Sequence, residues 1–329
     1  MSRSETNGLG YGGIDSAPLT LSTLESKAAL WKRLAAIGPS RLCLGFPDYE
    51  NLAEPTPHQY LLLGARPGMY KTTLAWNWAV NLAKTGKLVG WFGIEMSPDQ
   101  MALWTISRLT GIPAKRLEAF GRGRLSLTSD EQKRKEEAEE VYDCLPIAQW
   151  GRRRMNRVEL AEAIRMAPYD AIVVDYIGLV QGESSREREH ERISEASTLL
   201  RTLKEELPIF VCALAQMNRS IENPLAKPRP PNLSDLKGSG QLEADGDVIA
   251  FLHRAQGMAV NQREVQLRIE KNRFGPLGVV DLLAHPEIKF VEEKPDPEEQ
   301  QSTPEDERVV YPPYPPEQQV KFPGEQEEF

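Results

Sequence analysis

Between residues 40 and 291, short apolar runs alternate with stretches of helical periodicity. Several of these runs are apolar throughout, without the polar alternation of a strand that has one solvent-facing side. Such strands are buried on both faces, and helices between successive strands cover those faces. The pattern therefore predicts an α/β fold with a mostly parallel sheet flanked by helices. The expected strands cover residues 60–63, 88–94, 171–174, 209–215, 248–252, 265–269 and 279–283.

Three further regions flank this 40–291 domain. Residues 1–18 are rich in Gly and Ser and lack periodicity, so we expect them to be disordered. In residues 19–39, Ser22 and Glu25 form a capping box and Gly38 begins a stop signal, which predicts a short amphipathic helix. Its apolar stripe packs either on its own domain or on a neighbouring subunit. Residues 292–329 are dominated by Pro and Glu and are expected to form a disordered acidic tail.

The net charge of −8 does not describe the domain that contains the sheet. Residues 292–329 contain twelve acidic and three basic residues, a balance of −9, so the remaining chain is about +1 (−8 minus −9). The acidity of the whole chain therefore does not argue against a nucleic-acid partner. Three scattered cysteines without metal-type spacing favour a reduced, cytoplasmic compartment. The sequence has no run of about 18 apolar residues, so we expect no membrane span.

Residues 64–73 join the first expected strand to a helix through a glycine-containing turn. In this order, backbone N–H groups of the turn and the helix N-terminus can surround phosphate oxygens. Lys71 is expected to reach the β- and γ-phosphates of a nucleotide, and Thr72 to hold Mg²⁺. The expected nucleotide-binding residues are Gly64, Ala65, Arg66, Pro67, Gly68, Met69, Tyr70, Lys71, Thr72 and Thr73.

Tyr70 breaks the strict pattern G-x-x-x-x-G-K-[ST], because it stands where the second glycine belongs. Glycine is used at that position because the loop bends tightly and a side chain would crowd the phosphates. If the backbone φ angle is positive there, a tyrosine costs roughly 1–2 kcal/mol in strain.

Polar side chains stand directly after three other apolar runs: Glu95, Asp175 and Gln216. The carboxyl ends of parallel strands meet at one edge of a sheet, where ligands bind. Glu95 is placed to polarise an attacking water, and Asp175 to hold Mg²⁺ through water. Gln216 is placed to sense the γ-phosphate. With residues 64–73, these positions predict a nucleoside triphosphatase site that uses Mg²⁺.

The ordered set of motifs resembles the RecA-like motor domain of DnaB-like replicative helicases, from about residue 44 to residue 290. The segments downstream of residue 230 distinguish this family from RecA recombinases and KaiC-like ATPases, which share only the core. The motifs that carry the resemblance are Gly64-Ala-Arg-Pro-Gly-Met-x-Lys71-Thr-Thr, Glu95-Met-Ser97, Val174-Asp175-Tyr176, Gln216-Met-Asn-Arg219-Ser, Ser234-Asp-Leu-Lys-Gly-Ser-Gly240 with Glu243 and Asp247, and Lys271-Asn-Arg273-Phe-Gly-Pro276-Leu-Gly278.

The resemblance implies catalytic roles. Glu95 would be the catalytic carboxylate, Asp175 the acid that organises Mg²⁺, and Gln216 the sensor. Lys271 and Arg273 would act in trans on the γ-phosphate bound by an adjacent subunit. Oligomerisation would then be required for hydrolysis, and the family assembles as a ring that we expect to be hexameric.

The resemblance also implies a DNA contact. The loop around residues 234–240 would line the central channel and hold the phosphates of single-stranded DNA. Lys237 would supply charge, while Gly238 and Gly240 would allow close backbone approach. Such contacts ignore base identity. A flexible surface loop is the alternative interpretation, and the basic cluster that contains Arg154 is explained equally well by a solvent-facing turn.

The resulting hypothesis is an ATP-dependent ring helicase that moves 5′ to 3′ on single-stranded DNA during replication. One alternative is a ring protein with impaired nucleotide binding that regulates, loads or inhibits another helicase; a weaker one is a RecA-group recombinase or signalling ATPase. The family's N-terminal collar domain is expected to be absent, and the helix in residues 19–39 to dock on the next subunit. The acidic tail either contacts a replication protein, mimics nucleic acid or is inert.

Overall fold

The computed structural model describes residues 41–93, 95–151, 154–182, 187–217, 229–236, 239–254 and 263–295. The expected disordered N-terminus and linker helix lie outside these ranges, as do nearly all of the acidic tail, most of the basic cluster at 152–154, and the loop residues Lys237 and Gly238. None of the described helices is long and apolar enough to cross a membrane.

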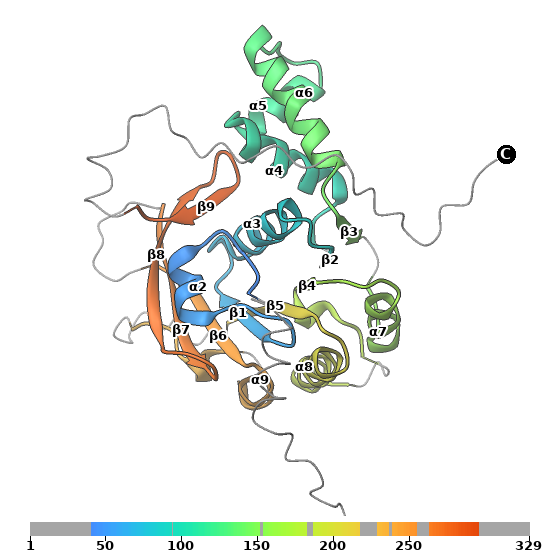
Figure 1. Ribbon diagram of the computed structural model, residues 1–329, viewed down its shortest axis with the longest axis vertical. Coiled ribbons are helices and arrows are strands. Elements are labelled where there is room, and N and C mark those ends of the chain that lie inside the picture. Colours follow the sequence, from blue (N-terminus) through green and yellow to red (C-terminus); the bar gives the residue numbers. More distant parts are fainter. Residues whose placement is uncertain are drawn as a thin grey trace, which may run out of the picture. The chain divides into compact units, whose positions relative to one another are not determined.

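The centre of the fold is a sheet in which the described residues form nine strands, in the order β3-β2-β4-β5-β1-β6-β7-β8-β9 (Figure 1). The pairs from β3 to β6 are parallel, and β6 to β9 are joined by antiparallel pairs. The predicted mostly parallel sheet is thereby confirmed. The strands are β1 Tyr60–Ala65, β2 Val89–Gly93, β3 Ile147–Trp150, β4 Ala171–Asp175, β5 Phe210–Gln216, β6 Val248–His253, β7 Glu264–Asn272, β8 Gly278–His285 and β9 Phe290–Glu293.

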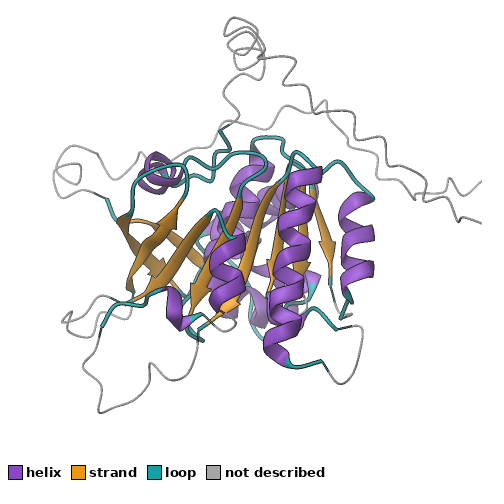
Figure 2. Ribbon diagram, turned by 90° about the horizontal axis from the view of Figure 1, so that it is seen from below, coloured by secondary structure: helices purple, strands orange, loops and turns teal. Residues whose placement is uncertain are grey.

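Helices cover both faces of the sheet (Figures 1 and 2). Side chains of β1 alternate between the two faces, as in any strand. Leu61 and Leu63 join the apolar cluster that includes Trp76 of α3, whereas Leu62 joins the cluster that includes Leu200 of α8. The helices are α2 Pro47–Ala53, α3 Lys71–Lys84, α4 Pro98–Thr110, α5 Ala114–Gly121, α6 Ser129–Asp143, α7 Arg157–Arg165, α8 Glu189–Glu206 and α9 Ser239–Asp245.

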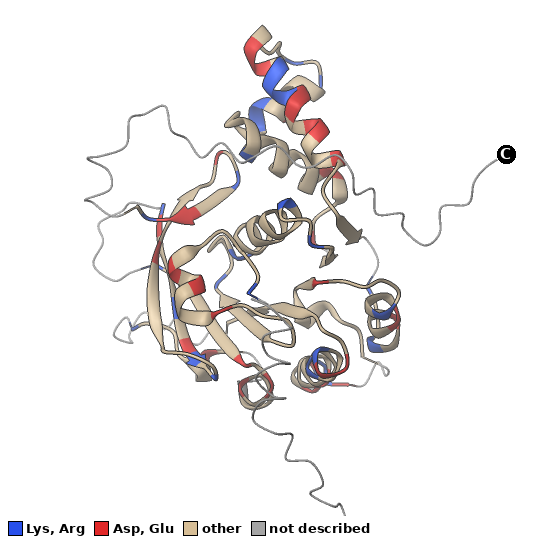
Figure 3. Ribbon diagram, viewed as in Figure 1, with Lys and Arg blue, Asp and Glu red and all other residues tan. Residues whose placement is uncertain are grey.

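Side-chain caps fix where two of the outer helices begin. Ser97 and Gln100 form a capping box at the start of α4. α6 begins at Ser129, because Thr128 and Glu131 form a reciprocal capping box there. Figure 3 shows acidic and basic residues interleaved along α6, where several pairs are four residues apart. Oppositely charged residues four positions apart support a solvent-facing helix in this way.

Candidate functional site

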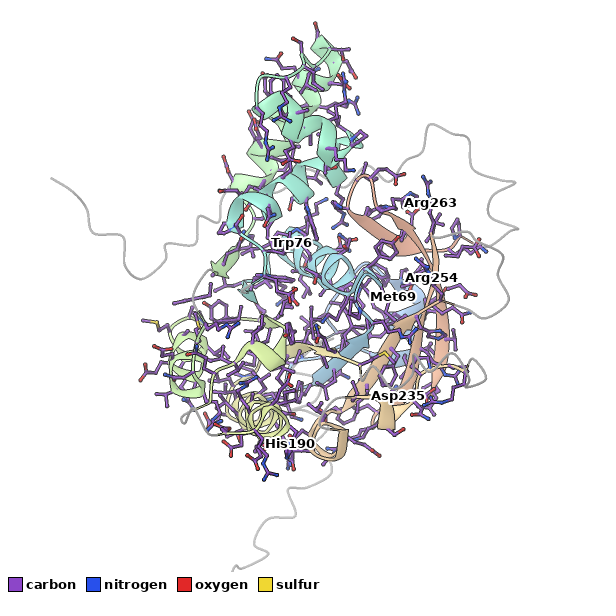
Figure 4. All side chains as sticks on the ribbon, turned by 180° about the vertical axis from the view of Figure 1, so that it is seen from behind. Met69, Trp76, His190, Asp235, Arg254 and Arg263 are labelled. Carbon is purple, nitrogen blue, oxygen red and sulfur yellow. The ribbon has the colours of Figure 1, made fainter. Side chains whose placement is uncertain are left out.

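The loop between β1 and α3 lies at the carboxyl edge of the parallel strands, with β1 between β5 and β6. Gly68 has φ 78°, and Met69, labelled in Figure 4, follows it in the loop. Tyr70 has φ 58° and ψ 18°, in the left-handed region, and it is the N-cap of α3. The backbone therefore has the positive φ on which the predicted strain depends. The ring of Tyr70 is partly buried against the apolar cluster on the α3 face of the sheet.

One pocket is lined by the loop between β1 and α3 and by two of the expected polar side chains. The carboxylate-bearing Glu95 follows β2 and is exposed, and Gln216 ends β5 and is half-buried. Both lie around the same opening as the loop, at the edge where the parallel strands end. The residues that line it are Ala65, Arg66, Pro67, Gly68, Met69, Tyr70, Lys71, Thr72, Thr73, Glu95 and Gln216.

Asp175 lies beneath this loop, at the end of β4, and is only 2% exposed. The Thr72 side chain lies beside its carboxylate. Burial raises the pKa of Asp175 to about 6, although the Lys71 charge and the Thr72 side chain lower it. Within the described part of the chain, Asp175 Oδ1 has no hydrogen-bond partner. A buried carboxylate oxygen without a donor is well suited to a cation or its bound water.

The ammonium group of Lys71 lies 5.2 Å from the ring centroid of Tyr176. Burial lowers the pKa of Lys71, while the charges of Asp175 and Glu95 raise it. A buried cation beside a left-handed turn and a helix N-terminus provides the charge that bound phosphate needs. The described residues contain no cluster of three His, Cys, Asp or Glu side chains able to hold a metal. The donor set instead fits Mg²⁺ held by a hydroxyl, a carboxylate and the oxygens of a phosphate ligand.

Lys271 and Arg273 lie near the amino ends of the parallel strands, whereas the pocket lies at their carboxyl ends. Residue 272 at the end of β7 pairs with Val248 at the start of β6, whereas Ala65 beside the pocket pairs with Leu252. Along β6, Val248 and Leu252 are four residues apart, which corresponds to about 13 Å at ~3.3 Å per residue. The structure therefore does not bring Lys271 and Arg273 to the pocket of their own chain. Their side chains donate instead to carbonyl oxygens in the last turn of α9.

An ion pair and a β-bridge hold residues 229–236 next to the end of β5. Asp235, labelled in Figure 4, accepts two hydrogen bonds from Arg229 at 2.7 and 2.6 Å and is 3% exposed. Leu236 forms an antiparallel bridge with Met217, the residue after Gln216. Gly240 follows in the first turn of α9, where it is exposed and an added Cβ would meet nothing within 4 Å.

Residues 45–292 match the family described as the DnaB-like helicase C terminal domain. The chain belongs to this family. It is 34% identical over 229 residues to the replicative DNA helicase DnaB of Treponema pallidum, covering 68% of this chain and 49% of that protein. It is 35% identical over 223 residues to a probable plasmid replicative DNA helicase of Chlamydia trachomatis, covering 66% of this chain and 46% of that protein. The chain thus spans about half the length of the curated relatives it matches.

Solved structures establish that this DnaB-like domain has the RecA-like fold predicted for it. One of them, described as an ATPase domain, aligns with a TM-score of 0.74 and 23% identity, covering 82% of this chain and 98% of that one. A DnaB-like replicative helicase, described together with its interactions with primase, aligns with a TM-score of 0.73 and 24% identity. This second match covers 82% of this chain and 67% of the other.

Sequence reasoning missed two features of this DnaB-like domain. The ion pair between Arg229 and Asp235 was not predicted, although Asn232, three residues before Asp235, is a capping-box signal that marks the turn. The contacts that hold Lys271 and Arg273 to α9 were not predicted either. No local pattern marks them, because the donors and acceptors are almost thirty residues apart.

Proposed function

We propose that this DnaB-like domain is an Mg²⁺-dependent ATPase that drives a ring of identical subunits along single-stranded DNA. The observation that carries the proposal is the single pocket in which the loop from Ala65 to Thr73 meets Glu95 and Gln216 above Asp175. The hexameric ring, the 5′ to 3′ direction and the role in DNA replication are proposed from the family likeness alone.

Each pocket residue has a proposed chemical role. Bound Mg²⁺–ATP supplies the γ-phosphoryl group for transfer to water. The loop amides and Lys71 bind the phosphates, and Thr72 with Asp175 hold the cation. Glu95, exposed at the pocket, orients the attacking water and accepts its proton. Gln216 contacts the γ-phosphate from the end of β5.

The pocket is completed by a second copy of the chain. Lys271 and Arg273 face away from their own pocket, on the edge where β6 begins. In a ring, that edge of one subunit meets the pocket edge of the next, and the two cations reach its γ-phosphate. A trans arginine of this kind contributes ~10³-fold or more to turnover. We therefore expect hydrolysis to depend on assembly and to fall when the protein is diluted.

Single-stranded DNA is the proposed polymer partner. Lys237, Gly238 and Gly240 would contact its phosphates without reading bases. The exposed position of Gly240 at the start of α9 supports this assignment, because no described atom lies close enough to require a glycine there. We further propose that residues 19–39 dock on the adjacent subunit and that residues 292–329 contact a replication protein.

Tyr70 favours a second function, that of a ring protein with impaired nucleotide binding that regulates, loads or inhibits another helicase. Its left-handed backbone and its position in the pocket lining are the observations behind this alternative. All the proposed catalytic positions nevertheless keep suitable side chains, so the working motor is preferred. The alternatives differ in ATP turnover and in unwinding of a forked duplex. Strand exchange without unwinding would instead point to a recombinase.

The deciding experiment is single-turnover ATP hydrolysis by the full chain, compared with Tyr70→Gly and Lys71→Ala. We expect the wild type to hydrolyse ATP well above Lys71→Ala and at or below Tyr70→Gly. A wild type that matches Lys71→Ala, while Tyr70→Gly hydrolyses ATP, would overturn the motor and favour the regulatory protein. Both variants should form the same oligomer as the wild type, which size-exclusion chromatography with light scattering can verify.

A further inference from the structure

Asp247, the residue just before β6, is a buried carboxylate with two cationic partners. It is 1% exposed. Its Oδ2 accepts from Lys204 Nζ at 2.6 Å and from the Tyr60 backbone N–H at 2.8 Å. Its Oδ1 accepts from Arg273 Nη1 at 3.3 Å. One carboxylate thus binds both a lysine of α8 and the arginine proposed to act on the neighbouring subunit.

The two cations are held differently. The Lys204 side chain is 11% exposed and makes the short contact, whereas the Arg273 side chain is 43% exposed and makes the long one. The second contact of Arg273 is to the Ala244 carbonyl at 2.6 Å, in the exposed last turn of α9. Lys204 is therefore the permanent counter-ion of Asp247, and Arg273 is the partner that solvent and a neighbour can reach.

Charge balance decides whether Arg273 can leave. Two positive side chains are bonded to Asp247 while Arg273 is docked, and the neutral Asp247–Lys204 pair remains after Arg273 leaves. Lys271 also interacts electrostatically with both Asp247 and Arg273. A buried carboxylate left without any cation would be strongly disfavoured. Lys204 removes that penalty. Asp245, the other buried carboxylate nearby, has partners of its own in Arg201 and Thr198.

We propose that the Lys204–Asp247 pair positions Arg273 and keeps it exchangeable. Asp247 holds the guanidinium at the subunit edge, and Lys204 weakens that hold enough for Arg273 to move to the γ-phosphate of the adjacent subunit. Asp247 and Lys204 are positioning residues, since neither touches the reacting atoms. The inference rests on the proposed function, because it takes Arg273 as the residue that completes the neighbour's pocket.

The test is a rescue in steady-state ATP turnover by the full chain. Lys204→Gln removes the lysine charge and should trap Arg273 on Asp247. We expect kcat to fall about tenfold, which is part of the ~10³-fold that a trans arginine contributes. KM for ATP should be nearly unchanged. The double variant Lys204→Gln/Asp247→Asn removes the trap and, with it, the positioning of Arg273. It should therefore recover most of the lost kcat but stay a few-fold below wild type. A double variant no faster than Lys204→Gln would overturn the proposal.

A second lysine–aspartate pair, more exposed than Lys204 and Asp247, controls for the loss of a lysine charge. Asp170, just before β4, accepts from Lys87 Nζ at 3.0 Å and from the Leu88 backbone N–H at 2.8 Å, with no arginine on it in the hydrogen bonds of the described residues. Lys87→Gln should therefore leave kcat unchanged. A loss equal to that of Lys204→Gln would mean that any such change slows turnover, and the proposal would fail.

Urea unfolding supplies a readout that does not depend on hydrolysis. Arg273→Ala should shift the unfolding midpoint much less than Lys204→Gln, because Asp247 keeps Lys204 in the first variant and loses its permanent partner in the second. Equal shifts would make Arg273 a structural counter-ion and overturn the inference. If the wild type hydrolyses no more ATP than Lys71→Ala, the proposed function fails instead, and this unfolding comparison still tests the Asp247 site.

Discussion

The side chain of Thr72 lies close enough to the carboxylate of Asp175 to lower its pKa, which brings the first turn of α3 against the end of β4. The two residues are about a hundred positions apart in the chain, and the sheet brings them together through β1, β5 and β4. These are the two side chains proposed to hold Mg²⁺. We propose that the fold itself brings these two ligands together, with Asp175 buried at the end of β4 and Thr72 in the first turn of α3.

Thr72 offers a direct test of that site. Thr72→Val keeps the shape but removes the hydroxyl, so the proposed cation site loses a ligand beside Asp175. We expect Mg²⁺-dependent binding of a fluorescent ATP analogue to weaken by about tenfold or more, from a lost charge-assisted bond of ~1.5–3 kcal/mol. Thr72→Ser keeps the hydroxyl and should bind like wild type. Equal Mg²⁺ dependence in the valine variant would remove Thr72 from the site.

Substitutions at Tyr70 separate the effect of its backbone from that of its ring. Tyr70→Gly and Tyr70→Ala both remove the ring from the pocket lining, so both should bind ATP more tightly than wild type. They should differ in stability, because alanine keeps the left-handed strain at φ 58° and glycine does not. We expect the free energy of unfolding of the alanine variant to be about 1 kcal/mol lower than that of the glycine variant.

Gly68 provides the control for the Tyr70 pair. Its φ is 78°, and an added Cβ would meet nothing within 4 Å, so Gly68→Ala introduces left-handed strain without a clash. Urea denaturation should show a loss of about 1 kcal/mol here as well. If Tyr70→Ala and Tyr70→Gly are equally stable while Gly68→Ala is destabilised, the strain assigned to Tyr70 is wrong.

The sequence predicted the sheet where burial makes strands apolar. All seven expected strands are present, but β3 and β9 were missed, because each is a four-residue edge strand that is mostly half-buried. Glu95, Asp175 and Gln216 were predictable from their positions after apolar runs, since parallel strands end at one edge. The contacts of Lys204 and Arg273 with Asp247 were not predictable from the sequence, because they depend on how α8 and β7 meet at the start of β6.

Gly64 tests how closely the start of the phosphate-binding loop is packed. A Cβ there would lie 2.7 Å from the Phe251 ring and 3.1 Å from Leu236 Cδ2, the side chain that anchors residues 229–236. Gly64→Ala should lower the free energy of unfolding by about 1–3 kcal/mol, as overpacked core substitutions do. Combining it with Phe251→Leu should recover much of that loss in urea denaturation. A fully stable Gly64→Ala would show that the Phe251 ring moves freely.

Gly240 tests the DNA contact without disturbing the fold. It lies in the first turn of α9, exposed and with open space around it, so Gly240→Ala should raise stability by up to about 1 kcal/mol through helix propensity. If a DNA phosphate approaches the backbone there, the added methyl group should weaken single-stranded DNA binding several-fold in fluorescence anisotropy. Gly121→Ala, at the end of α5 and equally open, should leave DNA affinity unchanged. Unchanged DNA affinity in Gly240→Ala as well would remove Gly240 from the interface and leave Lys237 and Gly238 as the residues to test.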